Sequence, residues 1–351
     1  MPARWPRPNG RARRARRARR GRAPARRLAG TMRPMARTSV AAADDLLDQR
    51  LDVLDHGFVR MVDYLGGDAR IVQSARVSYG EGTKTVREDR ALIDYLLRHR
   101  HTSPFEQVII TFHVKMPIFV ARQWIRHRTA RVNEMSGRYS VMRDEFYVPG
   151  PEAVRFQSES NKQGSTDADV PEALRERVIT ALRADQQRTF GEYEALLGDG
   201  IARELARVNL PLALYTEMYW QIDLNNLFHF LRLRLDWHAQ YEIRAYGDAI
   251  ARCVRAVAPL AFEAFEEHVL HAATLSRSEL DVLRHALDPA QLADALSASG
   301  LRRTRQQELW RKLGMTEPLG LTEPAGAAAG VAAVVDGSRN AGADADASAD
   351  A

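Results

Sequence analysis

The segment from Arg126 to Tyr139 combines side chains that bind anions with side chains that pair with heterocycles. It holds four arginines, one histidine, one glutamate, one asparagine and one serine within fourteen residues. Arginine presents a planar fork of N–H donors that matches phosphate or carboxylate oxygens, while Asn133, Glu134 and Ser136 suit the polar edge of a base or ring. The composition therefore indicates a ligand with both a phosphate and a heterocycle. The alternative is a solvated surface network, in which each ion pair contributes about 0–1 kcal/mol.

The order of these residues carries a second indication. Arg126-His127-Arg128, seven intervening residues and Ser136 resemble the signature of the flavin-dependent thymidylate synthase family. The resemblance extends from about Leu51 to Leu275. Its other stretches are Ser103-Pro104-Phe105-Glu106, Phe119-Val120-Ala121-Arg122-Gln123-Trp124, Gly137-Arg138-Tyr139, Leu210-Pro211-Leu212, Phe230-Leu231-Arg232-Leu233-Arg234, His238-Ala239-Gln240 and Glu242.

Four positions depart from the family pattern. Arg131 stands where the family usually has serine. Asp223, Asn225 and His229 stand where many members carry Asn, Arg and Asn. These departures bear more on the expected flavin contacts than on the expected nucleotide contacts.

The resemblance implies an α/β (α+β) fold in which a small sheet lies among many helices. It also implies conversion of dUMP to dTMP, with methylenetetrahydrofolate as the carbon donor, NADPH as the reductant and FAD as the bound flavin. The reaction includes a reduction, and protein side chains supply no hydride, so a cofactor has to do so. The family's members are homotetramers whose active sites are completed by neighbouring subunits, and the same assembly is expected here.

The resemblance assigns roles to individual residues. Arg234 matches the catalytic arginine that promotes ionisation of the uracil ring, and one such fixed donor lowers a barrier by about 2.7–4 kcal/mol. Arg138 and Arg207 are expected at the phosphate. The expected dUMP contacts are Gln123, Arg126, Glu134, Ser136, Gly137, Arg138, Arg207 and Arg234. The expected FAD contacts are Ser78, Ser103, Glu106, Arg126, His127, Arg128, Glu134, Asp223, Asn225 and His229.

Several of these residues have ordinary alternatives. Arg234 is otherwise a helix-surface ion pair. Three roles are open for Ser136: a nucleophile, a hydrogen-bond donor to the ring, or a part of the loop structure without a chemical role. A serine nucleophile needs a base within reach, and Glu134 is a weak substitute for a histidine, so we expect the hydrogen-bonding role. His127 lies between two cations, which disfavour both its protonation and a bound metal, so we expect a neutral side chain.

The histidines and the cysteine indicate neither a metal site nor a thiol nucleophile. His99 with His101, and His268 with His271, each lack a third ligand, so no metal is expected. The single cysteine, Cys253, excludes an intrachain disulfide. Its apolar neighbours at helical spacing indicate a core thiol, whereas a nucleophile needs an exposed, electropositive setting.

The elements around these residues can be read from apolar spacing. Val86–His99 is predicted as an amphipathic helix, Val108–Val114 as a buried strand, and Pro117–Ile125 as a helix. The apolar period lapses after His127, so Thr129–Arg138 is predicted as a loop that wraps the ligand. Downstream, a strand is predicted at Leu214–Ile222, with Asp223 as the N-cap of a helix. Further helices are predicted at Pro171–Leu197, Ile201–Val208, Ala239–Val257, Pro259–His271, Ser276–Leu287 and Pro289–Leu296.

The two ends of the chain differ from the centre. Residues 1–43 hold 14 arginines and no acid, and without them the chain has 37 basic and 45 acidic residues, a net charge of −8. Such a like-charged block is predicted to be disordered, as is the Ala/Gly/Asp-rich stretch 319–351. Between them we expect a synthase domain at 46–275 and a helical extension at 276–318.

The Arg-rich start has three interpretations. It could bind nucleic acid through its charge, it could be a transit peptide, or translation could begin at Met32 or Met35. The acidic remainder of the chain favours the third interpretation or an inert tail. A nucleic-acid-binding protein that uses this tail and the arginine cluster is the alternative function, while a phosphohydrolase would need a Gly-rich phosphate loop that the sequence lacks. No apolar run is long enough to span a membrane, so a cytoplasmic protein is expected.

Overall fold

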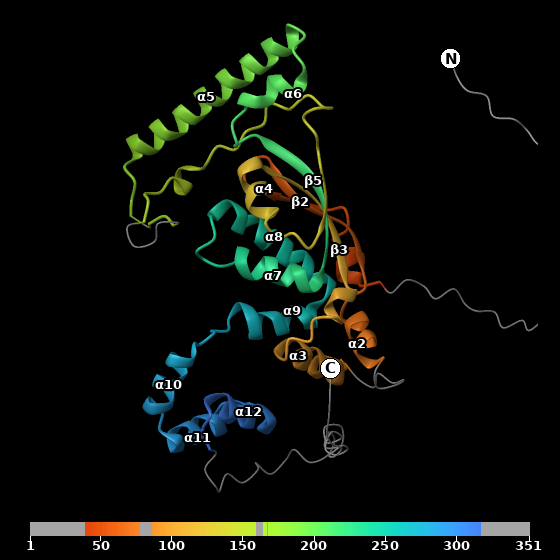
Figure 1. Ribbon diagram of the computed structural model, residues 1–351, viewed down its shortest axis with the longest axis vertical. Coiled ribbons are helices and arrows are strands. Elements are labelled where there is room, and N and C mark those ends of the chain that lie inside the picture. Colours follow the sequence, from red (N-terminus) through yellow and green to blue (C-terminus); the bar gives the residue numbers. More distant parts are fainter. Residues whose placement is uncertain (1–38, 78–85, 159–163, 167, 317–351) are drawn as a thin grey trace, which may run out of the picture. The chain divides into compact units, whose positions relative to one another are not determined.

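A computed structural model of the chain describes residues 39–77, 86–158, 164–166 and 168–316 (Figure 1). These residues form two compact units that divide after His268. The first unit carries all the residues expected in the site except Ser78, which lies outside the described residues. The two predicted tails also lie outside them, apart from residues 39–43, where a short helix α1 (Ala41–Asp44) begins.

A five-stranded antiparallel sheet forms the centre of the first unit. Its strands are β1 (Arg50–Val53), β2 (Gly57–Leu65), β3 (Ile109–Pro117), β4 (Arg131–Glu134) and β5 (Tyr215–Asp223), in the spatial order β1-β2-β3-β5-β4. Successive side chains of a strand point to opposite faces of a sheet. Ile110, Phe112 and Val114 alternate along β3 and are fully buried, so one face of the sheet belongs to the core.

Three helices pack against this buried face: α4 (Ile118–Trp124), α7 (Leu224–Arg234) and α8 (Tyr241–Val257) (Figure 1). Trp124, Trp220 and Phe230 come from α4, β5 and α7, and their ring centroids lie 4.8–5.1 Å apart. All three rings are fully buried. Replacement of such an aromatic ring by alanine typically costs about 3–5 kcal/mol. This aromatic cluster therefore anchors the last turns of α4 and α7 on the sheet.

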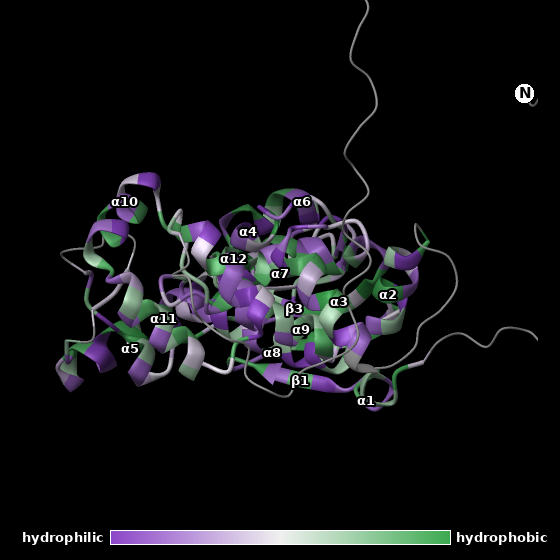
Figure 2. Ribbon diagram, turned by 90° about the horizontal axis from the view of Figure 1, so that it is seen from below, coloured by the Kyte–Doolittle hydropathy of each residue, from purple (hydrophilic) through white to green (hydrophobic). Residues whose placement is uncertain are grey.

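Three further helices pack against one another: α2 (Asp68–Arg76), α3 (Val86–Arg98) and α9 (Pro259–Phe265), which leads into a π-helical turn at Glu266–Leu270. The carboxylate of Asp68 accepts hydrogen bonds from the backbone N–H groups of Leu260 (2.8 Å) and Ala261 (3.0 Å). It thereby satisfies the start of α9, as a capping residue does. Hydrophilic and hydrophobic residues interleave along α2 and α3 (Figure 2), as expected for helices with one packed face.

A second apolar cluster lies beneath the long helix α5 (Glu172–Gly198), which is followed by α6 (Arg203–Ala206) and a 3-10 turn at Arg207–Asn209. Phe146, Phe190 and Tyr193 are among its buried residues. The hydroxyl of Tyr193 also accepts a hydrogen bond from the backbone N–H of Met142 at 3.0 Å. These contacts fix the chain that follows the Arg126–Tyr139 segment.

The second unit contains α10 (Arg277–Ala286), α11 (Pro289–Ala298) and α12 (Arg303–Leu313). Ser276 and Glu279 form a capping box at the start of α10. Leu296 and Trp310 belong to its small buried cluster. α12 ends at Gly314, whose positive φ of 63° is one that glycine adopts without strain.

Most predicted elements are confirmed. The helix and strand predictions near α3, β3, α4, α5, β5, α7, α8, α10 and α11 agree with the structure to within a few residues. Asp223 is the N-cap of α7, since its Oδ1 accepts from the N–H of Asn226 at 3.0 Å. The expected fold class, a small sheet among many helices, is also confirmed.

One loop prediction is wrong in part. Residues Arg131–Glu134 lie within the predicted loop Thr129–Arg138 but form β4, the edge strand that pairs with β5. All four residues are exposed, so no apolar alternation marks this strand in the sequence. Backbone pairing with a strand distant in sequence decides it instead. β1, β2, α2 and α12 were not predicted either.

The prediction for Cys253 is confirmed, because its thiol is buried in α8 and burial raises its pKa to about 12. A thiol with that pKa is protonated at neutral pH and is not a nucleophile. None of the described helices is both long enough and apolar enough to cross a membrane.

Candidate active site

Four polar residues meet where α4 and α7 end, and we call them the helix-end group: Gln123, His127, Arg234 and Gln240. Arg234 is the last residue of α7, His127 follows the end of α4, and Gln240 immediately precedes α8. Arg234 donates from Nε to His127 Nε2 and from Nη2 to the carbonyl oxygen of Gln123, both at 3.1 Å. Gln123 Nε2 donates to Gln240 Oε1 at 2.6 Å. These hydrogen bonds link the ends of α4 and α7 and the start of α8 through the guanidinium of Arg234 and the side chain of Gln123.

Arg234 is held in a partly desolvated position. Its side chain is half-buried, and burial lowers its pKa. The C-terminal end of a helix favours a cation, which offsets part of the cost of burial. A guanidinium has five N–H donors in one plane, and the bonds to His127 and Gln123 fix that plane. Interactions of a charge at such a position are stronger than those of a charge in water.

His127 is buried, with 9% of its surface exposed. Its pKa is lowered to about 4, first by burial and then by Arg234 and His229. Its ring lies edge-on to the rings of Phe230 and His229, at centroid distances of 4.9 and 5.7 Å. The lowered pKa agrees with the expected neutral side chain, but its causes are burial, Arg234 and His229, and not the flanking Arg126 and Arg128 on which the prediction rested.

Five residues lie together at the turn after β4 and at α6, and we call them the loop group: Ser136, Gly137, Arg138, Glu204 and Arg207. Arg138 Nε donates to Glu204 Oε2 at 2.9 Å, and both side chains are 58% exposed. A Cβ atom on Gly137 would lie 3.0 Å from both Cδ and Nη1 of Arg207. The absence of a side chain at Gly137 therefore lets Arg207 approach the turn.

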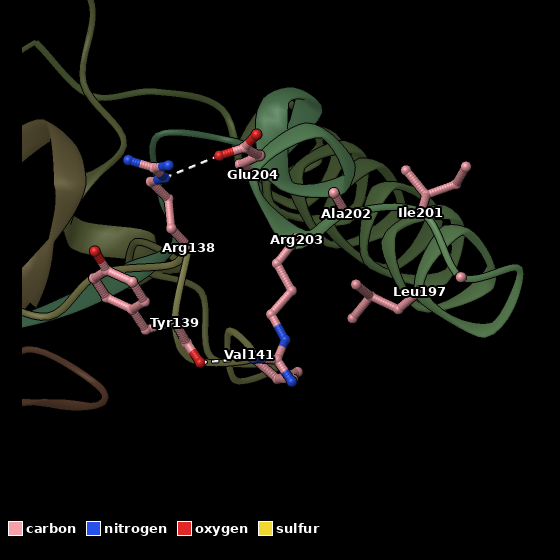
Figure 3. A pocket seen from close by; sticks show the side chains of 9 residues that line it. Arg138, Tyr139, Val141, Leu197, Ile201, Ala202, Arg203 and Glu204 are labelled. Carbon is pink, nitrogen blue, oxygen red and sulfur yellow. Dashed lines mark hydrogen bonds and ion pairs between the residues drawn. The ribbon is translucent and has the colours of Figure 1, made fainter. Parts of the chain in front are cut away.

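Arg138 and Glu204 line an open hollow of about 520 Å³ between this turn and the chain from α5 to α6 (Figure 3). Arg203 reaches across toward the turn, where its Nη1 donates to the carbonyl oxygen of Tyr139 at 2.7 Å. Apolar side chains complete the lining (Figure 3): Leu197 from α5, Ile201 and Ala202 from the chain that follows it, and Val141 from the turn. A concave surface with an apolar wall and arginine donors suits a small anionic ligand.

Ser136 takes part in the turn itself. Its Oγ accepts from the N–H of Arg138 at 3.3 Å, and its carbonyl oxygen accepts from the N–H of Tyr139 at 3.0 Å. Glu134, on β4, accepts a hydrogen bond from Thr216 Oγ1 at 2.7 Å. Among the described residues, no hydrogen bond joins this carboxylate to Ser136.

Five of the ten residues expected at the flavin belong to the segments where β3 begins and β5 ends. Asp223, the last residue of β5, pairs with Ile109 at the start of β3. The N–H of Leu224 donates to the carbonyl oxygen of Val108 at 2.8 Å, which brings the turn before β3 against the start of α7. The exposed or half-buried residues here are Ser103, Glu106, Asp223, Asn225 and His229, and Arg126 and Arg128 are exposed on the chain from α4 to β4.

The expected substrate residues fall into two groups of one chain. Gln123 and Arg234 belong to the helix-end group, and Ser136, Gly137, Arg138 and Arg207 belong to the loop group. Within the part of the chain that the structure describes, no hydrogen bond or ion pair joins the two groups. Along the sequence, Arg126 precedes His127 of the helix-end group, and Glu134 lies two residues before Ser136 of the loop group.

The sequence pattern did not indicate Glu204 and Thr216 as site residues, and it did not indicate the contact between Gln123 and Gln240. Glu204 precedes Arg207 by three residues, and helical i, i+3 spacing could have indicated it. The partnership of Thr216 with Glu134 arises from the pairing of β4 with β5. The bond from Gln123 to Gln240 arises from the packing of α4 on α8. Neither of these contacts leaves a local pattern in the sequence.

The histidines outside the helix-end group have other partners. The rings of His99 and His101 lie 6.4 Å apart, and His268 Nε2 lies 2.6 Å from Asp94 Oδ1. Among the described residues, no group of three or more His, Cys, Asp or Glu side chains is arranged to hold a metal ion.

Comparison with known proteins identifies relatives of this chain. The family described as "Thymidylate synthase complementing protein" matches residues 60–260. A flavin-dependent thymidylate synthase from Treponema denticola is 61% identical over 241 residues, which is 69% of this chain and 91% of the relative. One from Thermus thermophilus is 60% identical over 263 residues, 75% of this chain and 95% of the relative.

A solved structure also resembles the chain. It is a UMP/dUMP methylase, PolB from Streptomyces cacaoi, bound with 5-Br dUMP. The two share 32% sequence identity with a TM-score of 0.57, and the similarity covers 63% of this chain and 99% of the methylase. The match to the family includes the whole helix-end group and the whole loop group.

Proposed function

The chain belongs to the flavin-dependent thymidylate synthase family, and from this premise we propose that it converts dUMP to dTMP. Methylenetetrahydrofolate is the carbon donor, NADPH the reductant and FAD the bound flavin. The observation that carries the proposal is Arg234, a half-buried guanidinium fixed by His127 and by the carbonyl oxygen of Gln123. The PolB structure, a UMP/dUMP methylase bound with 5-Br dUMP, supports dUMP as the nucleotide.

The residues at the end of the sheet fit a flavin dinucleotide. Arg126 and Arg128 are exposed, so their planar forks are available to a pyrophosphate. Glu106 and Asn225 offer acceptor and amide groups to the ring or the ribose. When bound, the flavin supplies the hydride that the reduction requires. Ser103, His127, Glu134, Asp223 and His229 complete the proposed contacts, together with Ser78 outside the described residues.

Arg234 is the proposed catalytic residue. Carbon 5 of uracil becomes a better nucleophile when negative charge develops on the ring. A cation held beside N3 or a ring carbonyl stabilises that charge, and one such contact is worth about 2.7–4 kcal/mol. Because His127 and Gln123 already hold the guanidinium, little reorganisation remains when the ring arrives. Gln123 and Arg126 would contact the sugar and base.

Arg138 and Arg207 are the proposed phosphate ligands. Both belong to the loop group, and charge-assisted hydrogen bonds from arginine to phosphate are short and strong. Glu204 holds Arg138 until the phosphate displaces it. Ser136 and Gly137 present the turn to the nucleotide. Because no histidine is hydrogen-bonded to Ser136 among the described residues and Glu134 is a weak substitute for one, Ser136 is proposed as a hydrogen-bond donor and not as a nucleophile.

The active site is proposed to form between subunits of a homotetramer, with the helix-end group of one subunit facing the loop group of another. The division of the expected substrate residues into two groups supports this. Co-expression of Arg234→Ala and Arg138→Ala subunits tests it, because random mixing leaves about a quarter of shared sites with both arginines. Activity is measured at dUMP far below the raised KM expected for Arg138→Ala, where each variant alone is weakly active. Recovery of a comparable share of activity is expected. If each chain held a complete site, no mixed site would be intact and activity would stay at the level of the variants.

The flavin and the reaction have a direct test. The purified protein should show the visible absorbance of a flavoprotein, lose that absorbance when NADPH is added, and release tritium from dUMP labelled at carbon 5. Colourless protein that FAD does not reconstitute, or flavoprotein that releases no tritium, would contradict the proposal. The nucleic-acid-binding alternative predicts salt-dependent affinity for DNA without flavin. The relatives named here are synthases and a nucleotide methylase, which do not favour that alternative.

A further inference from the structure

We infer that His127 is a positioning residue for Arg234: its neutral imidazole accepts the Nε–H of Arg234 and thereby aims the rest of the guanidinium at the substrate ring. The inference rests on the proposed function of Arg234. It goes beyond that function, because flavin contact is the only role that the family resemblance assigns to His127.

The geometry defines the orientation of Arg234. One acceptor, His127 Nε2, lies 3.1 Å from Nε, and a second, the carbonyl oxygen of Gln123, lies 3.1 Å from Nη2. Two acceptors on different nitrogens prevent rotation of the planar group. Gln123 is itself held through Gln240, so both acceptors are fixed to helix ends. The remaining N–H donors then point in set directions.

The bond requires a neutral histidine. A protonated imidazole has two donors and no acceptor, so it would present an N–H to the N–H of Arg234. Burial beside Phe230 opposes protonation, and the pKa of His127 is lowered to about 4. With Nε2 as the acceptor, the ring carries its proton on Nδ1.

The charges around His127 also favour its neutral form. The titratable groups that face it from α7 are Arg234 and His229. Arg126 and Arg128 flank it on its own segment, and both are exposed. The neighbouring ring of Phe230 carries no charge. All four titratable neighbours are basic, so they disfavour a further positive charge. The bond to Arg234 should therefore persist through neutral pH and be lost as the pH falls toward 4.

A matched pair of variants of the full-length protein tests the inference. His127→Gln keeps an amide acceptor near the place of Nε2, whereas His127→Leu keeps similar volume without an acceptor. His127→Leu should lower kcat for tritium release by about 10- to 100-fold, as expected for a misplaced catalytic group. The KM for dUMP should change little. Because His127 is also a proposed flavin contact, FAD is added to saturation and its binding is checked by absorbance. His127→Gln should recover most of kcat. An unchanged kcat in His127→Leu overturns the inference.

A double-mutant cycle separates positioning from flavin contact. If His127 acts through Arg234, then His127→Leu should lower kcat little further in an Arg234→Ala background. If the two losses multiply, His127 acts independently and the inference fails.

Nuclear magnetic resonance of histidine labelled with ¹⁵N gives a readout that needs no turnover. His127 should be neutral at neutral pH with the proton on Nδ1, and its Nε2 shift should change in Arg234→Ala. A proton on Nε2, or an unchanged shift, overturns the inference even if the leucine variant fails to fold. Failure of the proposed function would appear differently, as wild-type protein without flavin or without tritium release.

Discussion

The helix-end group and the loop group hold their arginines in opposite ways. Arg234 is half-buried and bonded to two neutral acceptors, a histidine nitrogen and a backbone carbonyl. Arg138 is 58% exposed and bonded to Glu204, a carboxylate that is equally exposed. An exposed ion pair contributes about 0–1 kcal/mol, so an anionic ligand displaces it easily. Neutral acceptors, in contrast, orient a guanidinium without cancelling its charge.

The difference indicates a division of labour. A mobile, exposed arginine suits capture of a phosphate, because ligand binding replaces one anion by another. A fixed, partly desolvated arginine suits the chemical step, because catalytic stabilisation depends on groups that need no reorganisation. Changes in the two groups should therefore affect different kinetic constants.

The largest effect is expected for Arg234→Ala. Loss of one preorganised donor typically lowers kcat by about 100- to 1000-fold. The KM for dUMP should change much less, since the phosphate contacts remain. Measurement of dTMP formation and tritium release at saturating dUMP checks this. Arg232→Ala, an exposed neighbour on α7, is the matched control and should stay near the wild-type rate. A kcat for Arg234→Ala close to that of the wild type would show that Arg234 has no role in the chemical step and that the two groups do not differ in this way.

Arg138→Ala should act on binding. Hydrogen bonds to charged groups contribute about 1.5–3 kcal/mol, which corresponds to a rise of about 10- to 100-fold in the KM for dUMP. The kcat at saturation should stay within about threefold of the wild type, because Arg234 is untouched. Steady-state kinetics with dUMP and with deoxyuridine checks this, since the variant should discriminate less between them. Arg183→Ala, exposed on α5, serves as the control. A loss confined to kcat would assign Arg138 to the chemical step.

Gly137→Ala should weaken dUMP binding through Arg207. The added Cβ would lie 2.8 Å from Sδ of Met142 and 3.0 Å from Cδ of Arg207, so the turn or the arginine has to shift. Overpacking of this kind costs about 1–3 kcal/mol, and we expect the KM to rise by up to about tenfold. Gly191→Ala is a matched control, because nothing lies within 4 Å of its added Cβ. Identical dUMP affinity in Gly137→Ala and wild type would show that the close approach of Arg207 has no role.

The smallest effect is expected for Glu204→Gln, and its direction is opposite. Removal of the carboxylate frees Arg138 from a competing anion, so the KM for dUMP should fall by about two- to fivefold, in line with the strength of an exposed pair. The kcat should be unchanged. The effect should shrink at high salt, where such pairs are screened. Glu192→Gln, exposed on α5, controls for the change in net charge. A higher KM in Glu204→Gln would mean that Glu204 orients Arg138 for the phosphate.

Some parts of the fold could be predicted from local pattern, and others could not. The apolar spacing of α3 and α8 and the capping residue Asp223 act within a few residues, so the sequence displays them. β4 has four exposed residues and exists because β5 offers its edge. β2 likewise pairs with β3, which lies far along the chain, whereas β1 and β2 form a local hairpin that the sequence interpretation missed.

Individual contacts within the site are likewise only partly predictable from the sequence. The types and order of Arg126, His127, Arg138 and Arg234 are sufficient to indicate a nucleotide, a flavin and the family. Thr216 as the partner of Glu134, and Gln240 as the partner of Gln123, follow from packing alone. Residue types can indicate which ligand chemistry is possible, but not which side chains are already engaged with one another.

The sequence by itself determined the chemistry that this chain can offer: arginine donors, a core thiol without nucleophilic character, and no multi-cysteine metal site. Only the tertiary structure decided which arginine is fixed and which is exchangeable. That choice depends on burial and on acceptors from distant segments, such as the Nε2 of His127 that lies 3.1 Å from Arg234. Because electrostatic strength depends on desolvation, it arises only when the chain is folded.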